Sequence, residues 1–210
     1  MDNDQKSTKL SYWRWMVESW RHPMGMEANA SHGFGIWTLI WEDIILFWGF
    51  EVAGASIINA VFPGAIAQQL STEVNKFLFT LMILIFCFQI VTVLCSMVGH
   101  LFVFGSGSIG NFWGYVNKVM QASNWNIWIS IVGFICLLFT SNLGFVTVGY
   151  YLTLLFCAFF GLAAFVNVLR GEPENKPVKH DTFYGALIYV VLLGFAYAIL
   201  IALFRVVLSF

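Results

Sequence analysis

The chain has 210 residues, of which 60% are hydrophobic and only 10% are charged, and its mean hydropathy is +0.80. Soluble domains carry about 25% charged residues, so this composition predicts an integral membrane protein and excludes a disordered chain, which needs low hydrophobicity and high charge. The formal net charge of −1 leaves no basic footprint for nucleic acid, and no nucleic-acid partner is expected.

Residues 1–33 are predicted to be a cytoplasmic N-terminal segment with one short amphipathic helix. Its apolar residues recur at helical spacing, at Leu10, Trp13, Val17 and Trp20. Pro23 is expected to end the helix. Because tryptophan rings favour the headgroup region, these residues predict an interfacial helix lying along the inner leaflet. The alternative is a short helix packed on the bundle of spans.

Residues 34–210 are predicted to form an all-α membrane helix bundle with five transmembrane helices. A bilayer core of about 30 Å needs about 20 mostly apolar helical residues. The stretches that meet this test cover residues 43–61, 77–98 (extending toward 104), 125–139, 143–169 and 183–210. The third is short unless residues 124–142 are counted. The polar turn at 140–144 leaves almost no loop, so the third and fourth spans are expected to form an antiparallel hairpin.

A second amphipathic stripe lies between the second and third spans. It consists of Phe112, Tyr115, Val116 and Val119, which follow a glycine-rich stretch. The spacing predicts another interfacial helix on the same side of the membrane as the first.

The first span carries acidic residues. Glu42 and Asp43 are expected near one interface, which leaves Glu51 inside the membrane, where a charge costs roughly 2.5–3.5 kcal/mol. Asp43 and Glu51 are about 80° apart on a helix and share a face. His100, at the end of the second span, is a candidate partner for an acid. Asp43, Glu51 and His100 therefore form a candidate intramembrane polar site for protons or cations; the alternative is interfacial acids plus one neutral, hydrogen-bonded Glu51.

Basic residues give the expected orientation. Lys and Arg concentrate on the cytoplasmic side of membrane proteins. A cytoplasmic N-terminus with five spans places eight of the ten basic residues inside and two, Lys76 and Arg205, outside. The reverse arrangement inverts these numbers. We therefore expect a multi-pass membrane protein with its N-terminus in the cytoplasm and its C-terminus outside.

No pattern for catalysis or for a cofactor stands out. All four cysteines lie within apolar runs and none forms a CxxC pair, which is typical of buried apolar cysteine. The zinc-protease and nucleophile-elbow motifs are absent from the sequence. No enzyme, no cofactor and no metal site is expected.

Several features in combination resemble the Yip family of five-span membrane proteins and its bacterial relatives. The first is the aromatic entry at Tyr12-Trp13-Arg14-Trp15 and at residues 20–23. The second is the glycine-rich turn and amphipathic stretch at 105–121, where the best matches are Gly107, Gly110, Phe112 and Tyr115. The resemblance covers roughly residues 10–208.

The resemblance implies a scaffold or trafficking-type role in eukaryotes, no settled role in bacteria and no catalytic residues. The likeness to the bacterial members also implies a location in the cell membrane of a bacterium. The expected partners are the lipid bilayer and either other membrane proteins or a second copy of the chain. The leading hypothesis is thus a membrane protein that organises partners or the bilayer. The alternative hypothesis is a small transporter or channel that uses the intramembrane acids.

Overall fold

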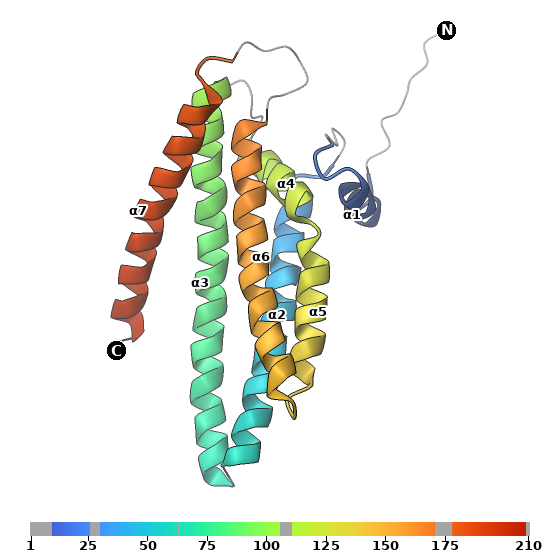
Figure 1. Cartoon of the computed structure of the whole chain (residues 1–210), viewed down its shortest axis with the longest axis vertical. Helices are drawn as coiled ribbons and strands as arrows, with labels where there is room; N and C mark the ends of the chain where they lie inside the picture. Colours follow the sequence, from blue (N-terminus) through green and yellow to red (C-terminus); the bar gives the residue numbers. More distant parts are fainter. Residues whose placement is uncertain (1–9, 26–29, 63, 106–110, 171–177, 209–210) are drawn as a thin grey trace.

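The computed structural model describes residues 10–25, 30–62, 64–105, 111–170 and 178–208. Within these ranges the chain is helical and has no strand, which confirms the all-α prediction (Figure 1). The helices are α1 (Tyr12–Arg21), α2 (Phe34–Val61), α3 (Ala65–Phe104), α4 (Phe112–Ser123), α5 (Asn126–Leu138), α6 (Leu143–Leu169) and α7 (Thr182–Leu208). The glycines of the resemblance at 107 and 110 lie outside the described residues.

The number of membrane-crossing helices is four or five. Helices α2, α3, α6 and α7 are each long and apolar enough to cross a bilayer. Helix α5 has 13 residues and so a length of about 20 Å, which is short of a bilayer core. Together with α4, which meets it at 60°, it passes the same length and hydropathy test as one bent span. The structure therefore supports a multi-pass membrane protein.

The predicted hairpin of the third and fourth spans is confirmed at the turn between α5 and α6. Helix α6 begins and ends at the predicted residues. A capping side chain fixes where it begins. The Oδ1 atom of Asn142 accepts a hydrogen bond from the backbone N–H of Gly144 at 2.9 Å. The two helices then pack side by side along α5.

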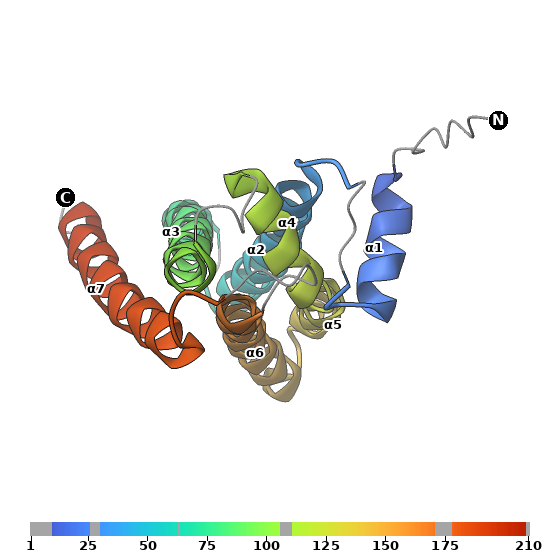
Figure 2. The ribbon, with the colours of Figure 1, turned by 90° about the horizontal axis from the view of Figure 1, so that it is seen from above.

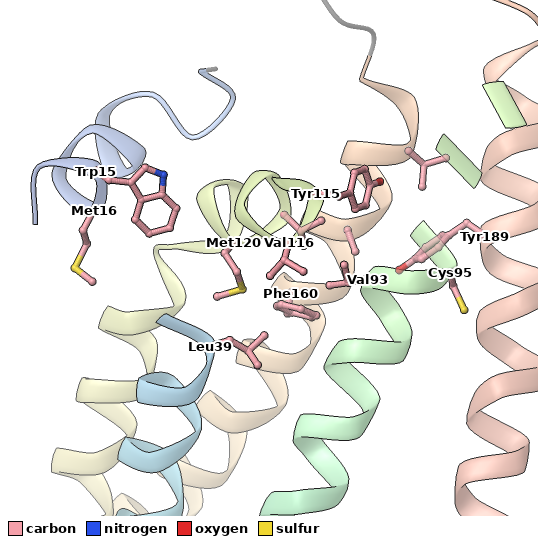
Figure 3. Packing of buried hydrophobic residues seen from close by; sticks show 13 residues of the cluster. Trp15, Met16, Leu39, Val93, Cys95, Tyr115, Val116, Met120, Phe160 and Tyr189 are labelled. Carbon is pink, nitrogen blue, oxygen red and sulfur yellow. The ribbon is translucent and has the colours of Figure 1, made fainter. Parts of the chain in front are cut away.

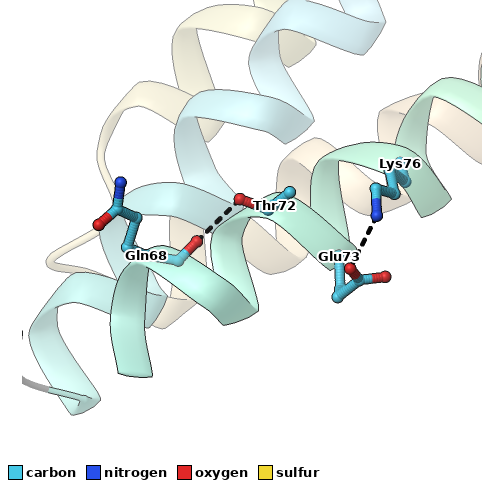
Figure 4. A network of polar contacts seen from close by, with 4 residues as sticks. All are labelled: Gln68, Thr72, Glu73 and Lys76. Carbon is cyan, nitrogen blue, oxygen red and sulfur yellow. Dashed lines mark hydrogen bonds and ion pairs between the residues drawn. The ribbon is translucent and has the colours of Figure 1, made fainter. Parts of the chain in front are cut away.

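Helix α3 begins twelve residues before the predicted second span. Its added turns carry polar side chains with local hydrogen bonds, shown in Figure 4. The Nζ atom of Lys76 lies 2.8 Å from Oε1 of Glu73, and the Thr72 hydroxyl donates to the backbone carbonyl of Gln68 at 2.9 Å. With 40 residues, α3 is about 60 Å long, twice the thickness of a bilayer core. Its first turns therefore extend past the end of the α5–α6 hairpin (Figure 1).

Helix α4 lies across one end of the bundle, as the view from above shows (Figure 2). Its predicted stripe is packed inward, since Tyr115, Val116 and Val119 are all buried. Asn117 joins α4 to the start of α2: its Oδ1 atom accepts from the Gly35 N–H at 2.6 Å, and its Nδ2 atom donates to the Ser31 carbonyl at 2.7 Å. Helix α4 thus satisfies backbone groups that the end of α2 leaves open.

The main apolar core lies where α1, α4 and the upper parts of the long helices meet (Figure 3). Trp15 and Met16 come from α1, Met120 from α4, Leu39 from α2 and Phe160 from α6. All five side chains are buried. This core holds the cross-lying α4 against the vertical helices, and it positions the polar residues that lie one to two turns below it.

Candidate functional site

Glu42 and Asp43 lie inside α2. The helix begins at Phe34, eight residues before Glu42, so the first span does not begin at Asp43 as predicted. Glu42 is 0% exposed and Asp43 is 5% exposed. Asp43 shares a cavity wall with Phe156, the middle residue of α6. The two acids are therefore buried at mid-height of the bundle.

Asp43 is bound to α3 through one oxygen. The Nε2 atom of Gln89 donates a hydrogen bond to Asp43 Oδ1 at 3.0 Å, a contact between two helices. Asp43 Oδ2 and Gln89 Oε1 are buried and have no hydrogen-bond partner among the described residues. An amide whose nitrogen donates to a carboxylate has its oxygen fixed on the other side, so both unpartnered atoms are acceptors.

Glu42 faces α5 rather than α3. Helices α2 and α5 run in the same direction (Figure 1), and Gly133 of α5 faces Leu46 while Leu137 faces Gly49. Continuing this pairing by one helical turn toward the N-terminal ends of both helices places Glu42 at the level of Ser130. Asn126 lies one further turn in the same direction. Both Glu42 carboxyl oxygens are buried without a described donor.

Two polar residues of α5 complete this level of the bundle. Asn126 donates from Nδ2 to the carbonyl of Phe156 at 3.2 Å, which fixes its Oδ1 atom as an acceptor. Asn126 Oδ1 and Ser130 Oγ are buried without a described partner. We call the set the acid layer, made up of Glu42, Asp43, Gln89, Asn126 and Ser130.

The acid layer combines many acceptors with few donors. Its unpartnered atoms are Glu42 Oε1 and Oε2, Asp43 Oδ2, Gln89 Oε1, Asn126 Oδ1 and Ser130 Oγ. Of these only the Ser130 hydroxyl carries a hydrogen of its own when both acids are ionised. Buried acceptors are satisfied in native proteins, so these atoms are the ones in the layer that protons, water or a small cation would bind. No group of three or more His, Cys, Asp or Glu that could hold a metal occurs in the described ranges.

A cavity of about 240 Å³ reaches the acid layer between α2, α3 and α6. Asp43 forms part of its wall, and apolar side chains form most of the rest. A second cavity of about 220 Å³ lies between α3, α6 and α7 and is lined in part by Gln89. The bonded pair of Asp43 and Gln89 therefore lies between two cavities.

The predicted trio of Asp43, Glu51 and His100 is not brought together. Glu51 lies eight residues beyond Asp43, about 12 Å along α2, and its Oε1 atom accepts from Asn75 Nδ2 at 3.4 Å. His100 is near the other end of α3, where its Nδ1 atom lies 2.9 Å from the carbonyl oxygen of Asn167. Each of the three side chains has a different neighbour.

The N-terminal segment forms a helix, α1, as predicted, and this helix presents two apolar faces. On one face Trp13 is 72% exposed and Val17 is 39% exposed, while Leu10 and Trp20 are half-buried. The other face is buried against the bundle, and it contains Trp15. The Tyr12 hydroxyl lies 2.9 Å from Thr38 Oγ1 of α2, and burial raises the pKa of Tyr12 above its usual value.

Sequence reasoning missed Glu42, Asn126 and Ser130 as members of one site. A signal was present in the i, i+4 spacing of Asn126 and Ser130, which places both on one face of an otherwise apolar helix. The hydrogen bond from Gln89 to Asp43 joins α3 to α2.

Comparison of the chain with protein-family models, with curated proteins and with solved structures finds no match. The resemblance to the Yip family therefore stays a prediction, and the function has to be argued from the acid layer itself.

Proposed function

We propose that the protein is a membrane transport protein whose acid layer binds and releases protons within the bilayer. The observation that carries the proposal is the adjacent pair Glu42 and Asp43, buried at mid-height, with three of its four carboxyl oxygens lacking a donor. Two ionised acids buried side by side without a counter-ion cost several kcal/mol. Protons or another cation remove this cost, and intramembrane acids commonly mark such pathways.

The protein is proposed to cross the membrane five times, with α4 and α5 as one bent span. From the level of Glu42 the helix rise gives about 11 Å up to Gly35, where α4 lies, and α5 gives about 12 Å from Ser130, at that level, down to Leu138. These lengths together give about 23 Å, most of a bilayer core of about 30 Å. The acid layer is then deep in the hydrocarbon, and Glu51 is close to the far surface.

The N-terminus is proposed to be cytoplasmic. The end of the bundle that carries α1 and α4 also holds Arg14, Arg21, Lys118, Arg170 and Lys179. The far end of α3 holds Lys76. This asymmetry follows the positive-inside rule.

Cysteine labelling in intact cells tests this topology. Gln69→Cys and Ser141→Cys, both at exposed positions of the far end, are expected to react with a membrane-impermeant maleimide added outside. Val178→Cys, exposed at the opposite end, is expected to react only after permeabilisation. The unmodified chain, with its four native cysteines, is the background control. External labelling of Val178→Cys together with protection of Gln69→Cys reverses the orientation.

Proton movement into proteoliposomes tests the function. The vesicles contain potassium and the pH indicator pyranine, and valinomycin sets an inside-negative potential that drives proton entry. The wild-type protein is expected to acidify the interior. Glu42→Gln and Asp43→Asn each remove one proton site, so flux is expected to fall to the level of protein-free vesicles.

Two variants of acids outside the layer serve as matched controls. Glu73→Gln changes an exposed acid on the polar turns of α3, and Glu51→Gln changes the acid that binds Asn75. Both are expected to keep wild-type flux. Unchanged flux in Asp43→Asn and Glu42→Gln would contradict the proposal, as would an inactive wild-type protein.

A second candidate function is the scaffold role implied by the Yip resemblance. The observation that favours it is the exposed aromatic face of α1 beside a groove of about 540 Å³ that Trp13, Trp20, Trp41 and Trp128 help to line. Such a face suits contact with lipid or with another membrane protein. The flux assay separates the two functions, because a scaffold leaves wild-type vesicles impermeable to protons.

A further inference from the structure

The cavity below the acid layer has a polar end and apolar walls. Asp43 and Leu46 form part of its α2 wall, and Leu78 and Ile85 belong to α3. From α6, the Thr153 hydroxyl is already donated to a backbone carbonyl at 3.0 Å, so this residue offers no free donor to the cavity. Asp43 is therefore the charged group on an otherwise largely hydrocarbon surface, and its Oδ2 atom has no described partner.

A hydrated metal ion fits this cavity poorly. Alkali and divalent cations exchange their water for several oxygen ligands, and the walls on the way to Asp43 are formed mostly by leucine, isoleucine and phenylalanine side chains. A cation that carries its own apolar surface meets no such barrier. The volume of about 240 Å³ lies below the range of about 300–1,000 Å³ for drug-sized sites, which points to a small molecule.

An ammonium group complements the unpartnered atom at the polar end. It has three N–H donors and no acceptor, whereas Asp43 Oδ2 is an acceptor without a described donor. Aromatic rings of Phe47 and Phe156 line the same cavity, and ring faces attract cations in dry sites. The alkyl tail of such a molecule would occupy the apolar space between α2, α3 and α6.

We propose that this cavity binds a small lipophilic primary amine in its cationic form, with the ammonium group on Asp43 and the tail between α2, α3 and α6. The inference rests on the proposed function, because the carboxyl group that takes a proton there takes an ammonium ion here. It assigns the transport site a substrate class, an apolar molecule with one positive charge.

Cysteine protection measures the binding without any transport step. Cys157 lines the cavity, whereas Cys87 does not line it and reports on general effects. The purified protein in lipid nanodiscs at pH 7 is treated with N-ethylmaleimide, and labelling of each cysteine is followed by peptide mass spectrometry. The probes are octylamine, 1-octanol and octanoate, which share a tail and differ in charge; the amine is cationic at this pH because such groups titrate near pH 10.

Octylamine is expected to slow the labelling of Cys157 and to leave Cys87 unchanged. It should do so at about tenfold lower concentration than 1-octanol, a ratio that corresponds to about 1.4 kcal/mol for the charge contact. Asp43→Asn is expected to abolish this difference, and Asp43→Glu, which keeps the charge, to retain it. Glu51→Gln is the matched control and is expected to retain the preference in full.

Equal protection by octylamine and 1-octanol in the wild-type protein overturns the inference, as does an amine preference that persists in Asp43→Asn. If Asp43→Asn does not elute as a single folded species, Gln89→Leu serves instead, since it removes the hydrogen bond that orients the Asp43 carboxylate and must weaken the preference. Proton flux is measured separately. Flux without amine selectivity overturns this inference alone, and amine selectivity without flux overturns the proposed function alone.

Discussion

Gly185→Val is expected to separate α7 from the rest of the bundle. A Cβ atom at this glycine would lie 2.2 Å from Val103 Cγ2 and 2.9 Å from the carbonyl oxygen of Gly99 on α3. The contact is reciprocal, because a Cβ at Gly99 would lie 2.7 Å from the Gly185 carbonyl oxygen. Small residues allow this close approach of two membrane helices. No side-chain rotation relieves the clash with backbone, so the two helices have to move apart.

The effect is large because the clash falls where α7 is most buried. Helix α7 is close to α3 near its start and diverges from it toward the C-terminus (Figures 1 and 2). Apart from Gly185, the buried residue of its described part is Tyr189, one turn further along. Overpacking a tight contact costs about 1–3 kcal/mol and sometimes more, and here it falls on the close backbone contact between α7 and α3.

Thermal unfolding of the purified protein measures the loss. Gly185→Val is expected to lower the melting temperature, because separating α7 from α3 also breaks the contact between the hydroxyl groups of Thr92 and Tyr197, which are 2.7 Å apart in the wild type. Gly194→Val is the matched control in the same helix, because no atom lies within 4 Å of a Cβ added there. Equal melting temperatures for Gly185→Val and the wild type would refute this account of α7.

Hydropathy predicted the long apolar helices well and their polar extensions poorly. The limits of α6 follow from an uninterrupted apolar run and a capping asparagine, both visible in the sequence. The early start of α3 at Ala65 was missed because a hydropathy criterion detects only apolar residues. Gln, Glu and Lys also form helices readily in water, and these residue types occur in the first turns of α3. Helix length and span length are different quantities in this chain.

The depth of the acids could not be predicted because a sequence shows charge and not partners. A rule that places charges at interfaces is sound for an isolated helix. In the bundle, Gln89 from α3 supplies a donor to Asp43, and the register of α2 against α5 places Glu42 beside Ser130. Tertiary packing thus changes where these acids can be accommodated, and it made Glu42 rather than Glu51 the deeply buried acid.

The choice between the two faces of α1 shows the same limit. Its ten residues carry apolar side chains at Tyr12, Trp15 and Met16 on one side and at Trp13 and Val17 on another. The helical spacing of apolar residues predicted the second set as the apolar face of the helix, and the structure leaves this set exposed. In the first set Trp15 and Met16 are buried and Tyr12 is half-buried, because small Ser19 lies on that side and lets α1 approach the bundle, where Asn124 bonds to its hydroxyl.

Trp15→Ala is expected to destabilise the protein by about 3–5 kcal/mol, the usual cost of removing a large buried side chain. Trp15 is 0% exposed and is part of the core in Figure 3. Its ring centroid lies 5.8 Å from that of Phe34 and 6.1 Å from that of Tyr12. The side chain therefore connects α1 to the start of α2, and its loss is expected to release α1 from the bundle.

Trp13→Ala provides a matched control on the same helix. Trp13 is 72% exposed, so its removal is expected to change the unfolding free energy by no more than about 0.5 kcal/mol in detergent. Trp15→Phe is expected to cost less than Trp15→Ala, because the indole N–H has no described acceptor to lose and most of the ring volume is kept. Thermal unfolding of the three purified variants, compared with the wild type, gives the order of their stabilities.

A larger loss in Trp13→Ala than in Trp15→Ala would mean that α1 is held by the face that the sequence pattern predicted. That result would also weaken the scaffold candidate, because an aromatic face used for packing is not free to contact lipid or a partner. If Trp15 is the anchor, the groove beside Trp13 stays open at the membrane surface while α1 is fixed in place. The two tryptophans, two residues apart and on different faces of one helix, then have separate roles, one in stability and one in contact with the bilayer.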